Sequence, residues 1–160
     1  MSSSKVVVQL LGITAFALSA TLASAQEQRP GYGTPVTVDQ AKKIAAGVVA
    51  ECRGIKVNVA VAVVDTHGLL IYFERMEDTQ TASSKIAIMK AKAAATYRRP
   101  TRVFMDVINK TPATATLPGV VGSPGGVPIF VGGKVTGAVG ASGGTGDQDE
   151  QCVKAGLAGM

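Results

Sequence analysis

The sequence predicts an α+β domain with one antiparallel sheet and helices packed on one side of it, in two layers. Two pairs of apolar segments support this prediction, because each pair is joined by a tight turn and strands joined so closely run antiparallel. Helical patterns before, between and after these hairpins supply the second layer. The predicted strands are residues 56–65 with 69–75, around the turn Asp65-Thr66-His67-Gly68, and 127–131 with 134–141, around Gly132-Gly133.

The first predicted helix covers residues 38–52. Thr37 and Gln40 have the spacing of a capping box, and Ile44 and Val48 recur at helical spacing on one face. Gly54 follows the last apolar position, as expected at the end of a helix.

A second, alanine-rich helix is predicted for residues 82–98. Ile86, Met89 and Ala93 share one face, so we expect Met89 to lie in the core. Pro100 ends this helix, because the residue before a proline disfavours helical dihedrals. Thr101 is then expected to cap a short helix that ends near residue 109.

The last strand and helix carry most of the glycine. Gly137 and Gly140 remove two side chains from the strand, which allows something to approach its backbone closely. A packed helix, a flat ligand and a neighbouring subunit all satisfy this pattern. Asp147 and Glu150 lie in the first turn of the helix that follows, where carboxylates favour the positive end of the helix dipole.

The chain divides into a signal peptide at residues 1–25, a polar lead-in at 26–36 and one domain at 37–160. Lys5 precedes an apolar run, and Ala23-Ser24-Ala25 has the form of a cleavage site. We therefore expect a periplasmic or secreted protein, cleaved near Ala25 and without a membrane span after processing. The alternative is a retained N-terminal anchor.

Composition argues against nucleic acid as a partner. The net charge is +5, but the basic residues are spread along the chain, and aromatic residues make up only 4% of it. Binders of single-stranded nucleic acid need aromatic side chains interleaved with basic ones. The two cysteines, Cys52 and Cys152, suggest one disulfide in an oxidising compartment, and two separately buried thiols are the alternative.

Four segments resemble the GlcG/HbpS-type haem-binding family, which also includes the C-terminal domain of PduO-type corrinoid adenosyltransferases. The resemblance implies a profilin-like or PAS-like fold that assembles into dimers or octamers. It also implies haem as a cofactor, iron in some relatives and, in one secreted branch, a membrane sensor protein as partner. The segments are VAVVDTHGLLIYFERME (61–77), SSKIAIMKAKAAATYRRPT (83–101), GGVPIFVGGKVTGAVGASGG (125–144) and QDEQCVKAGL (148–157).

The best candidates for cofactor binding lie at the end of the second helix. Tyrosine can ligate ferric haem, and arginine pairs with carboxylates such as haem propionates. This points to the segment Tyr97, Arg98, Arg99 and Thr101, for which a purely structural role at the helix end is the alternative. His67 is the only histidine and a further candidate iron ligand, although its position in a turn also fits a surface residue.

Glu74 and Glu77 form a carboxylate pair that could hold iron weakly, as part of a coordination shell. The G-x-S-x-G match at residues 140–144 is not a nucleophile elbow, since no histidine follows it. No catalytic residue is predicted, and whether the protein is an enzyme stays open.

The preferred hypothesis is an exported haem- or tetrapyrrole-binding protein that acts as a carrier, scavenger or sensor accessory. The alternative is an enzyme or accessory protein for a small organic acid in a catabolic operon, with Arg75 or Arg99 holding the carboxylate.

Overall fold

The computed structural model describes residues 29–160. The predicted signal peptide and the first residues of the lead-in lie outside this range. The helices and strands are α1 (Val38–Gly54), β1 (Ala60–Val64), β2 (Leu70–Arg75), α2 (Ser83–Tyr97), α3 (Thr101–Lys110), the 3₁₀ helix η1 (Pro112–Thr116), β3 (Gly126–Val131), β4 (Lys134–Ser142) and α4 (Gly146–Ala158).

Both predicted hairpins are present, and together they build one four-stranded sheet in the order β2-β1-β4-β3. Every pairing between these strands is antiparallel, including the central one between β1 and β4. The α+β class and the single antiparallel sheet are therefore confirmed. The lead-in also contributes, because Tyr32 bridges Val135 and continues the sheet beyond the end of β1.

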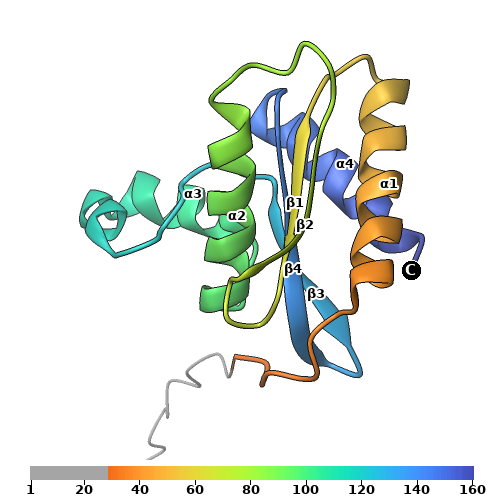
Figure 1. Ribbon diagram of the computed structural model, residues 1–160. Coiled ribbons are helices and arrows are strands. Elements are labelled where there is room, and N and C mark those ends of the chain that lie inside the picture. The colour runs from red at the N-terminus through yellow and green to blue at the C-terminus, as the bar shows by residue number, and fades with distance from the viewer. Residues whose placement is uncertain (1–28) are drawn as a thin grey trace, which may run out of the picture.

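Helices cover both faces of the sheet, so the prediction of helices on one side was wrong. Figure 1 shows α2 on one face and α1 with α4 on the other. The reason lies in β1, where every residue is buried. Val61 and Val63 pack toward α1 and α4, whereas Ala60 and Ala62 pack toward α2. The apolar character of β1 is thus explained within the monomer, whereas β2 is only partly buried.

Glycine allows α2 to lie directly on the sheet. Gly126 and Gly140 are partners in the β3–β4 register. A Cβ atom on Gly140 would lie 2.2 Å from the carbonyl oxygen of Ala87, and one on Gly126 would lie 2.3 Å from that of Lys90. The glycine-rich strand therefore receives a packed helix, and it is not an open rim for a ligand or a second subunit.

On the opposite face, α1 and α4 are joined covalently. Cys52 and Cys152 form a disulfide between residues 100 positions apart in sequence, with 5.4 Å between their Cα atoms. Both helices begin with a complete capping box, at Thr37 as expected and also at Thr145.

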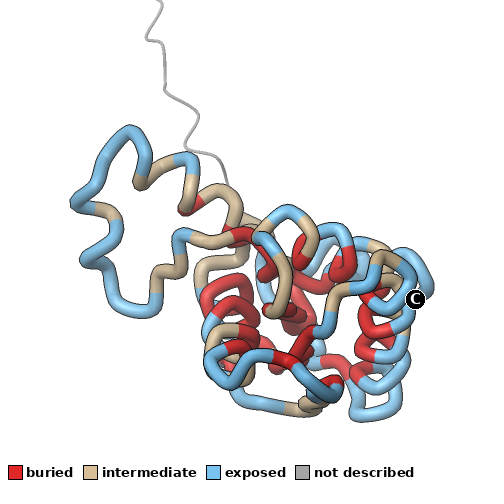
Figure 2. Tube along the Cα trace, turned by 90° about the horizontal axis from the view of Figure 1, so that it is seen from above, coloured by how far each residue is buried: buried red, intermediate tan, exposed pale blue. Residues whose placement is uncertain are grey.

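Helix α3 and η1 extend away from the packed body of the domain (Figures 1 and 2). Only Thr101 and Phe104 of α3 are buried, and no residue of η1 is. We call residues 101–121 the arm. No helix within residues 29–160 has the length and apolar character needed to cross a membrane.

Candidate functional site

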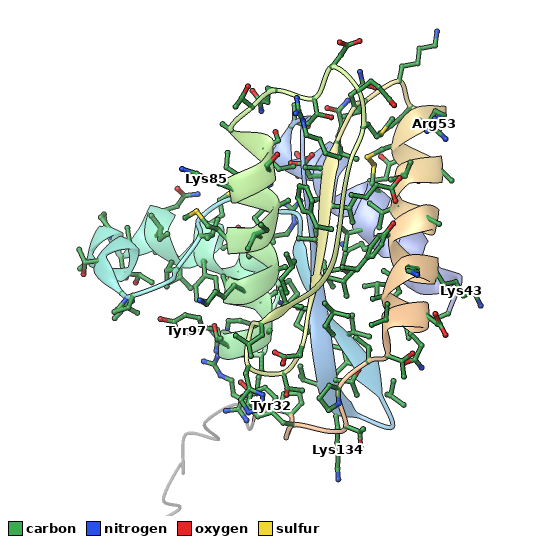
Figure 3. All side chains as sticks on the ribbon, viewed as in Figure 1. Tyr32, Lys43, Arg53, Lys85, Tyr97 and Lys134 are labelled. Atoms are coloured by element: carbon green, nitrogen blue, oxygen red, sulfur yellow. A yellow bond between two sulfur atoms is a disulfide. The ribbon has the colours of Figure 1, made fainter. Side chains whose placement is uncertain are left out.

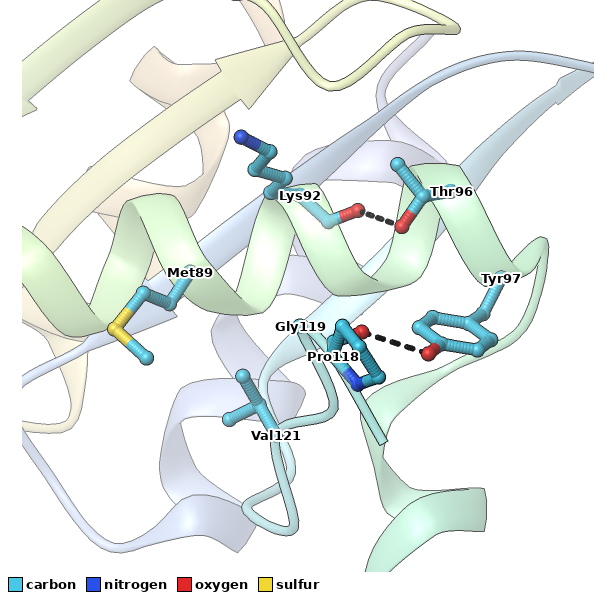
Figure 4. Close-up of a pocket in the computed structure, with 7 residues that line it drawn as sticks. All are labelled: Met89, Lys92, Thr96, Tyr97, Pro118, Gly119 and Val121. Carbon is cyan, nitrogen blue, oxygen red and sulfur yellow. Dashed lines mark hydrogen bonds between the residues drawn. The ribbon is translucent and has the colours of Figure 1, made fainter. Parts of the chain in front are cut away.

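A pocket of about 480 Å³ lies between the outer face of α2 and the end of the arm (Figure 4). This volume is within the range of small-molecule sites, roughly 300–1,000 Å³. We call it the α2 pocket. Most of its lining is apolar, and it is formed by Met89, Lys92, Thr96, Tyr97, Pro118, Gly119 and Val121.

Met89 lies at one end of this pocket and is 54% exposed, so its expected place in the core was wrong. The sheet decides which face of α2 is buried. The close contact of α2 with the backbone of Gly140 favours small side chains, and Ala87 and Ala91 occupy the positions against it. The larger Met89 is left on the outer face.

Tyr97 lies at the other end of the α2 pocket (Figures 3 and 4). Its hydroxyl group donates a hydrogen bond of 2.7 Å to the carbonyl oxygen of Pro118. Its ring meets the ring of Phe104 edge-on, with 5.0 Å between the centroids. Tyr97 therefore connects α2 to both ends of the arm and forms a fixed wall of the pocket.

Arg98 and Arg99 do not line the pocket. Arg98 has left-handed backbone dihedrals at the end of α2, donates to the carbonyl oxygen of Pro30 and lies over the Tyr32 ring at 5.2 Å. The guanidinium group of Arg99 lies 5.8 Å over the Phe104 ring. Arg98 therefore fixes the lead-in against the end of α2, and Arg99 stacks on the base of the arm.

The cation of the α2 pocket is Lys92, which the sequence analysis missed. Positions 89, 92 and 96 follow one another at helical spacing, so Lys92 lies beside Met89 and Thr96 on the outer face. The sequence could have indicated Lys92 if Met89 had been assigned to the exposed face, because residues 92 and 96 share that face with residue 89.

Thr101 is fully buried and away from the pocket. Its hydroxyl group accepts a 3.0 Å hydrogen bond from the backbone N–H of Gly126. It does not cap α3 as expected, since it is the first helical residue and no side chain caps that helix. Thr101 therefore connects the base of the arm to β3.

His67 lies in the turn between β1 and β2, and its side chain is 80% exposed. The carboxylate of Asp65 holds this turn by accepting hydrogen bonds from the backbone N–H groups of His67 and Leu69, each at 2.8 Å. Gly68 packs against Lys92 and Thr96, so the turn adjoins the α2 pocket. His67 itself is not among the lining residues.

Glu74 and Glu77 are not brought into a metal site. The carboxylate of Glu74 accepts a hydrogen bond of 3.2 Å from the hydroxyl group of Tyr72. The pKa of Tyr72 is raised, chiefly because the hydroxyl group is partly desolvated and also because the carboxylate of Glu74 lies beside it. Residues 29–160 contain no cluster of three or more histidine, cysteine, aspartate or glutamate residues suited to a metal ion.

Two ion-pair systems that the sequence analysis missed hold α2 and the arm to α4. Lys90 and Asp149 form a 2.8 Å pair and are both almost fully buried. Burial raises the pKa of Asp149, although Lys90 opposes this effect. At the base of the arm, Arg102 pairs with Asp147 and Glu150, and its pKa is raised by these two hydrogen bonds. The carboxylates in the first turns of α4 are therefore stabilised by ion pairs with Lys90 and Arg102 as well as by the helix dipole.

Comparison with known proteins places this fold in a family. The profile described as "Haem degrading protein HbpS-like" matches residues 36–158. The chain belongs to the HbpS-like family. The resemblance noted in the sequence is thereby confirmed.

Three relatives illustrate the range of the family. An uncharacterised 15.0 kDa protein from the dhaT–dhaS intergenic region of Citrobacter freundii is 37% identical over 122 residues, which are 71% of this chain and 84% of that protein. The crystal structure of HbpS matches with a TM-score of 0.74 and 30% identity, over 79% of this chain and 90% of that one. The crystal structure of a PduOC–heme complex matches with a TM-score of 0.73 and 25% identity, over 79% of this chain and 96% of that one.

Proposed function

We propose that this protein binds haem, or a closely related tetrapyrrole, in the α2 pocket, and acts outside the cytoplasm as a carrier, scavenger or sensor accessory. The α2 pocket itself is the main support for this proposal. It has apolar walls for a porphyrin ring, a sulfur atom in Met89 and an oxygen atom in Tyr97 as candidate iron ligands, and a cation in Lys92 for the propionates.

Membership of the HbpS-like family and similarity to a PduOC domain crystallised with heme support the same ligand. Haem would supply iron-centred ligand exchange and redox chemistry, whereas this chain binds the ring and excludes water from one side of it. Iron held by Glu74 and Glu77 is not part of the proposal, because no third ligand lies with them among residues 29–160.

Titration of the purified protein with hemin tests the proposal. We expect a saturable shift of the Soret band at micromolar protein. Thr96→Trp, which places a large ring in the α2 pocket, should abolish this shift. Thr81→Trp is the matched control, because Thr81 is exposed and does not line the pocket. If no shift occurs with the unmodified protein, the proposal is overturned.

Export is proposed from residues 1–25 and is supported by the Cys52–Cys152 disulfide, since such bonds persist mainly in oxidising compartments. Mass spectrometry of protein recovered from a bacterial periplasm should show cleavage after Ala25. An uncleaved mass would favour the retained anchor.

Assembly into a dimer or octamer, and contact with a membrane sensor, belong to the same proposal. The projecting arm exposes Leu117, and the edge strand β2 begins with the exposed Leu70, so apolar surface is available for subunit contacts. Light scattering tests the assembly, and a monomer at all concentrations would contradict it.

The small-acid alternative receives less support. The guanidinium group of Arg75 donates to the carbonyl oxygen of Thr79, and Arg99 stacks on Phe104 outside the pocket. A largely apolar pocket of this size suits a larger, flatter ligand than a small hydroxy acid.

A further inference from the structure

The geometry points to the thioether of Met89, and not to the hydroxyl group of Tyr97, as the group that ligates the iron of haem in the α2 pocket. This inference rests on the proposed function, which it deepens by assigning the ligand. From the sequence, Tyr97 is the favoured ligand and Met89 is expected in the core.

Four pocket residues carry a side-chain heteroatom, and two of these are already engaged. The hydroxyl group of Thr96 donates to the carbonyl oxygen of Lys92 at 2.8 Å, within its own helix. The hydroxyl group of Tyr97 donates to Pro118 at 2.7 Å. Ligation by Tyr97 requires its phenolate, so the proton that bonds Pro118 would be lost and the arm released.

The ammonium group of Lys92 has no lone pair for iron. It can instead pair with a propionate. Met89 is then the remaining donor among the residues that line the pocket.

The surroundings of Met89 differ from those of a structural methionine in the same chain. Met76 is 7% exposed, and its sulfur atom accepts a hydrogen bond of 3.5 Å from the backbone N–H of Val59. The Met89 side chain is 54% exposed, and its sulfur atom accepts no hydrogen bond from any residue between 29 and 160. The sulfur atom is therefore free, and it lies at one end of an open pocket with a mostly apolar lining.

Spacing along α2 separates the two candidate ligands. Residues 89 and 97 are eight positions apart, which is about 12 Å along a helix with a rise of 1.5 Å per residue. The two side chains therefore lie at opposite ends of the pocket, and Tyr97 is held at its end by the bond to Pro118, so we assign a single ligand. With iron at Met89, Lys92 lies one turn further along for the charged edge of the ring, and Tyr97 keeps its bond to Pro118.

A thioether ligand has a measurable consequence. Methionine ligation raises the reduction potential of haem, because the soft sulfur atom favours ferrous iron. Replacement of Met89 should therefore change the spectrum and the reduction potential of the bound haem as well as the affinity for it.

The experiment compares hemin titrations and reduction potentials of the unmodified protein, Met89→Leu, Tyr97→Phe and Met105→Leu. Met105→Leu is the matched control, because Met105 lies in the arm outside the α2 pocket. Leucine at position 89 keeps the apolar volume and removes the sulfur atom. Met89 is exposed, so this variant should fold, and circular dichroism checks that it does.

We expect Met89→Leu to change the Soret position, lower the reduction potential and weaken hemin binding at least about tenfold, the loss that removal of an outer-shell partner already causes. Met105→Leu should keep the spectrum and affinity of the unmodified protein. Tyr97→Phe should keep the Soret position and the reduction potential, although loss of its bond to Pro118 should weaken binding. If Met89→Leu binds hemin with an unchanged spectrum and potential, or if Tyr97→Phe alone changes both, the ligand assignment is wrong while the proposed function stands. If the unmodified protein does not bind hemin, the proposed function fails and the assignment with it.

Discussion

The two faces of the sheet are packed in different ways. Toward α1 and α4 the sheet presents valine, as at Val61, Val63 and Val139, and the disulfide reinforces that layer. Toward α2 the sheet presents mainly alanine and glycine, and α2 packs against them mainly with alanine side chains. A layer of large side chains tolerates adjustment of rotamers, whereas contact between a helix and a bare strand leaves no free volume.

This difference explains where the candidate site lies. The inner face of α2 carries mainly alanine, and its one fully buried long side chain, Lys90, is held by Asp149. Met89 and Lys92 lie on the outer face, where they line the α2 pocket. The closely packed face also fixes the helix in place, so the pocket has a rigid floor. Four predictions test the contrast between the two faces, from the largest expected effect to the smallest.

Lys90→Met should lower the free energy of unfolding by about 3–5 kcal/mol, because it leaves the buried carboxylate of Asp149 without its partner. Urea denaturation measures this loss. Lys85→Met is the control, since Lys85 is exposed on the same helix (Figure 3) and its replacement should have an effect within about 0.5 kcal/mol.

The double variant Lys90→Met with Asp149→Leu removes both charges and should be more stable than Lys90→Met alone. Equal stability of the single and double variants would show that the unpaired carboxylate of Asp149 is not the cause of the loss.

On the opposite face, Cys52→Ala with Cys152→Ala should cost about 2–4 kcal/mol, because the disulfide closes a long loop in the unfolded chain. Thermal unfolding with and without reductant measures it. The reductant should destabilise the unmodified protein and leave the double variant unchanged. A reductant effect on the double variant would contradict this assignment.

Gly140→Ala should cost about 1–3 kcal/mol, because the new methyl group meets the backbone of α2 at Ala87. Gly54→Ala is the matched control at the end of α1, where an added Cβ has no atom within 4 Å. Calorimetry compares the two. If Gly140→Ala is as well tolerated as Gly54→Ala, the close approach of α2 to the sheet is refuted.

Tyr97→Phe should cost about 1 kcal/mol, the usual contribution of one hydrogen bond, because the ring and its contact with Phe104 remain. Amide hydrogen exchange should increase at residues 117–121, which the hydroxyl group fixes, and stay unchanged on the α1 and α4 face. Unchanged exchange in this segment would mean that the bond to Pro118 does not hold the arm.

The sequence by itself determined the local structure. The capping box at Thr37, the turn at Gly132-Gly133 and the stop at Pro100 act within a few residues, so the helices and hairpins were predicted close to their observed bounds. The count of two cysteines suggested one disulfide, with two buried thiols as the alternative, and the structure contains the disulfide. The family was recognised because four segments resemble it in the same order along the chain.

The tertiary structure decided what depends on contacts between distant segments. Burial of β1 on both sides placed helices on both faces of the sheet, and contact with Gly126 and Gly140 turned Met89 outward. The partners of Lys90, Tyr97 and Arg102 lie from 21 to 59 positions away along the chain. The spacing of residues along the sequence predicts that a helix forms. Which face of that helix is buried depends on the shape of the sheet surface against which it packs.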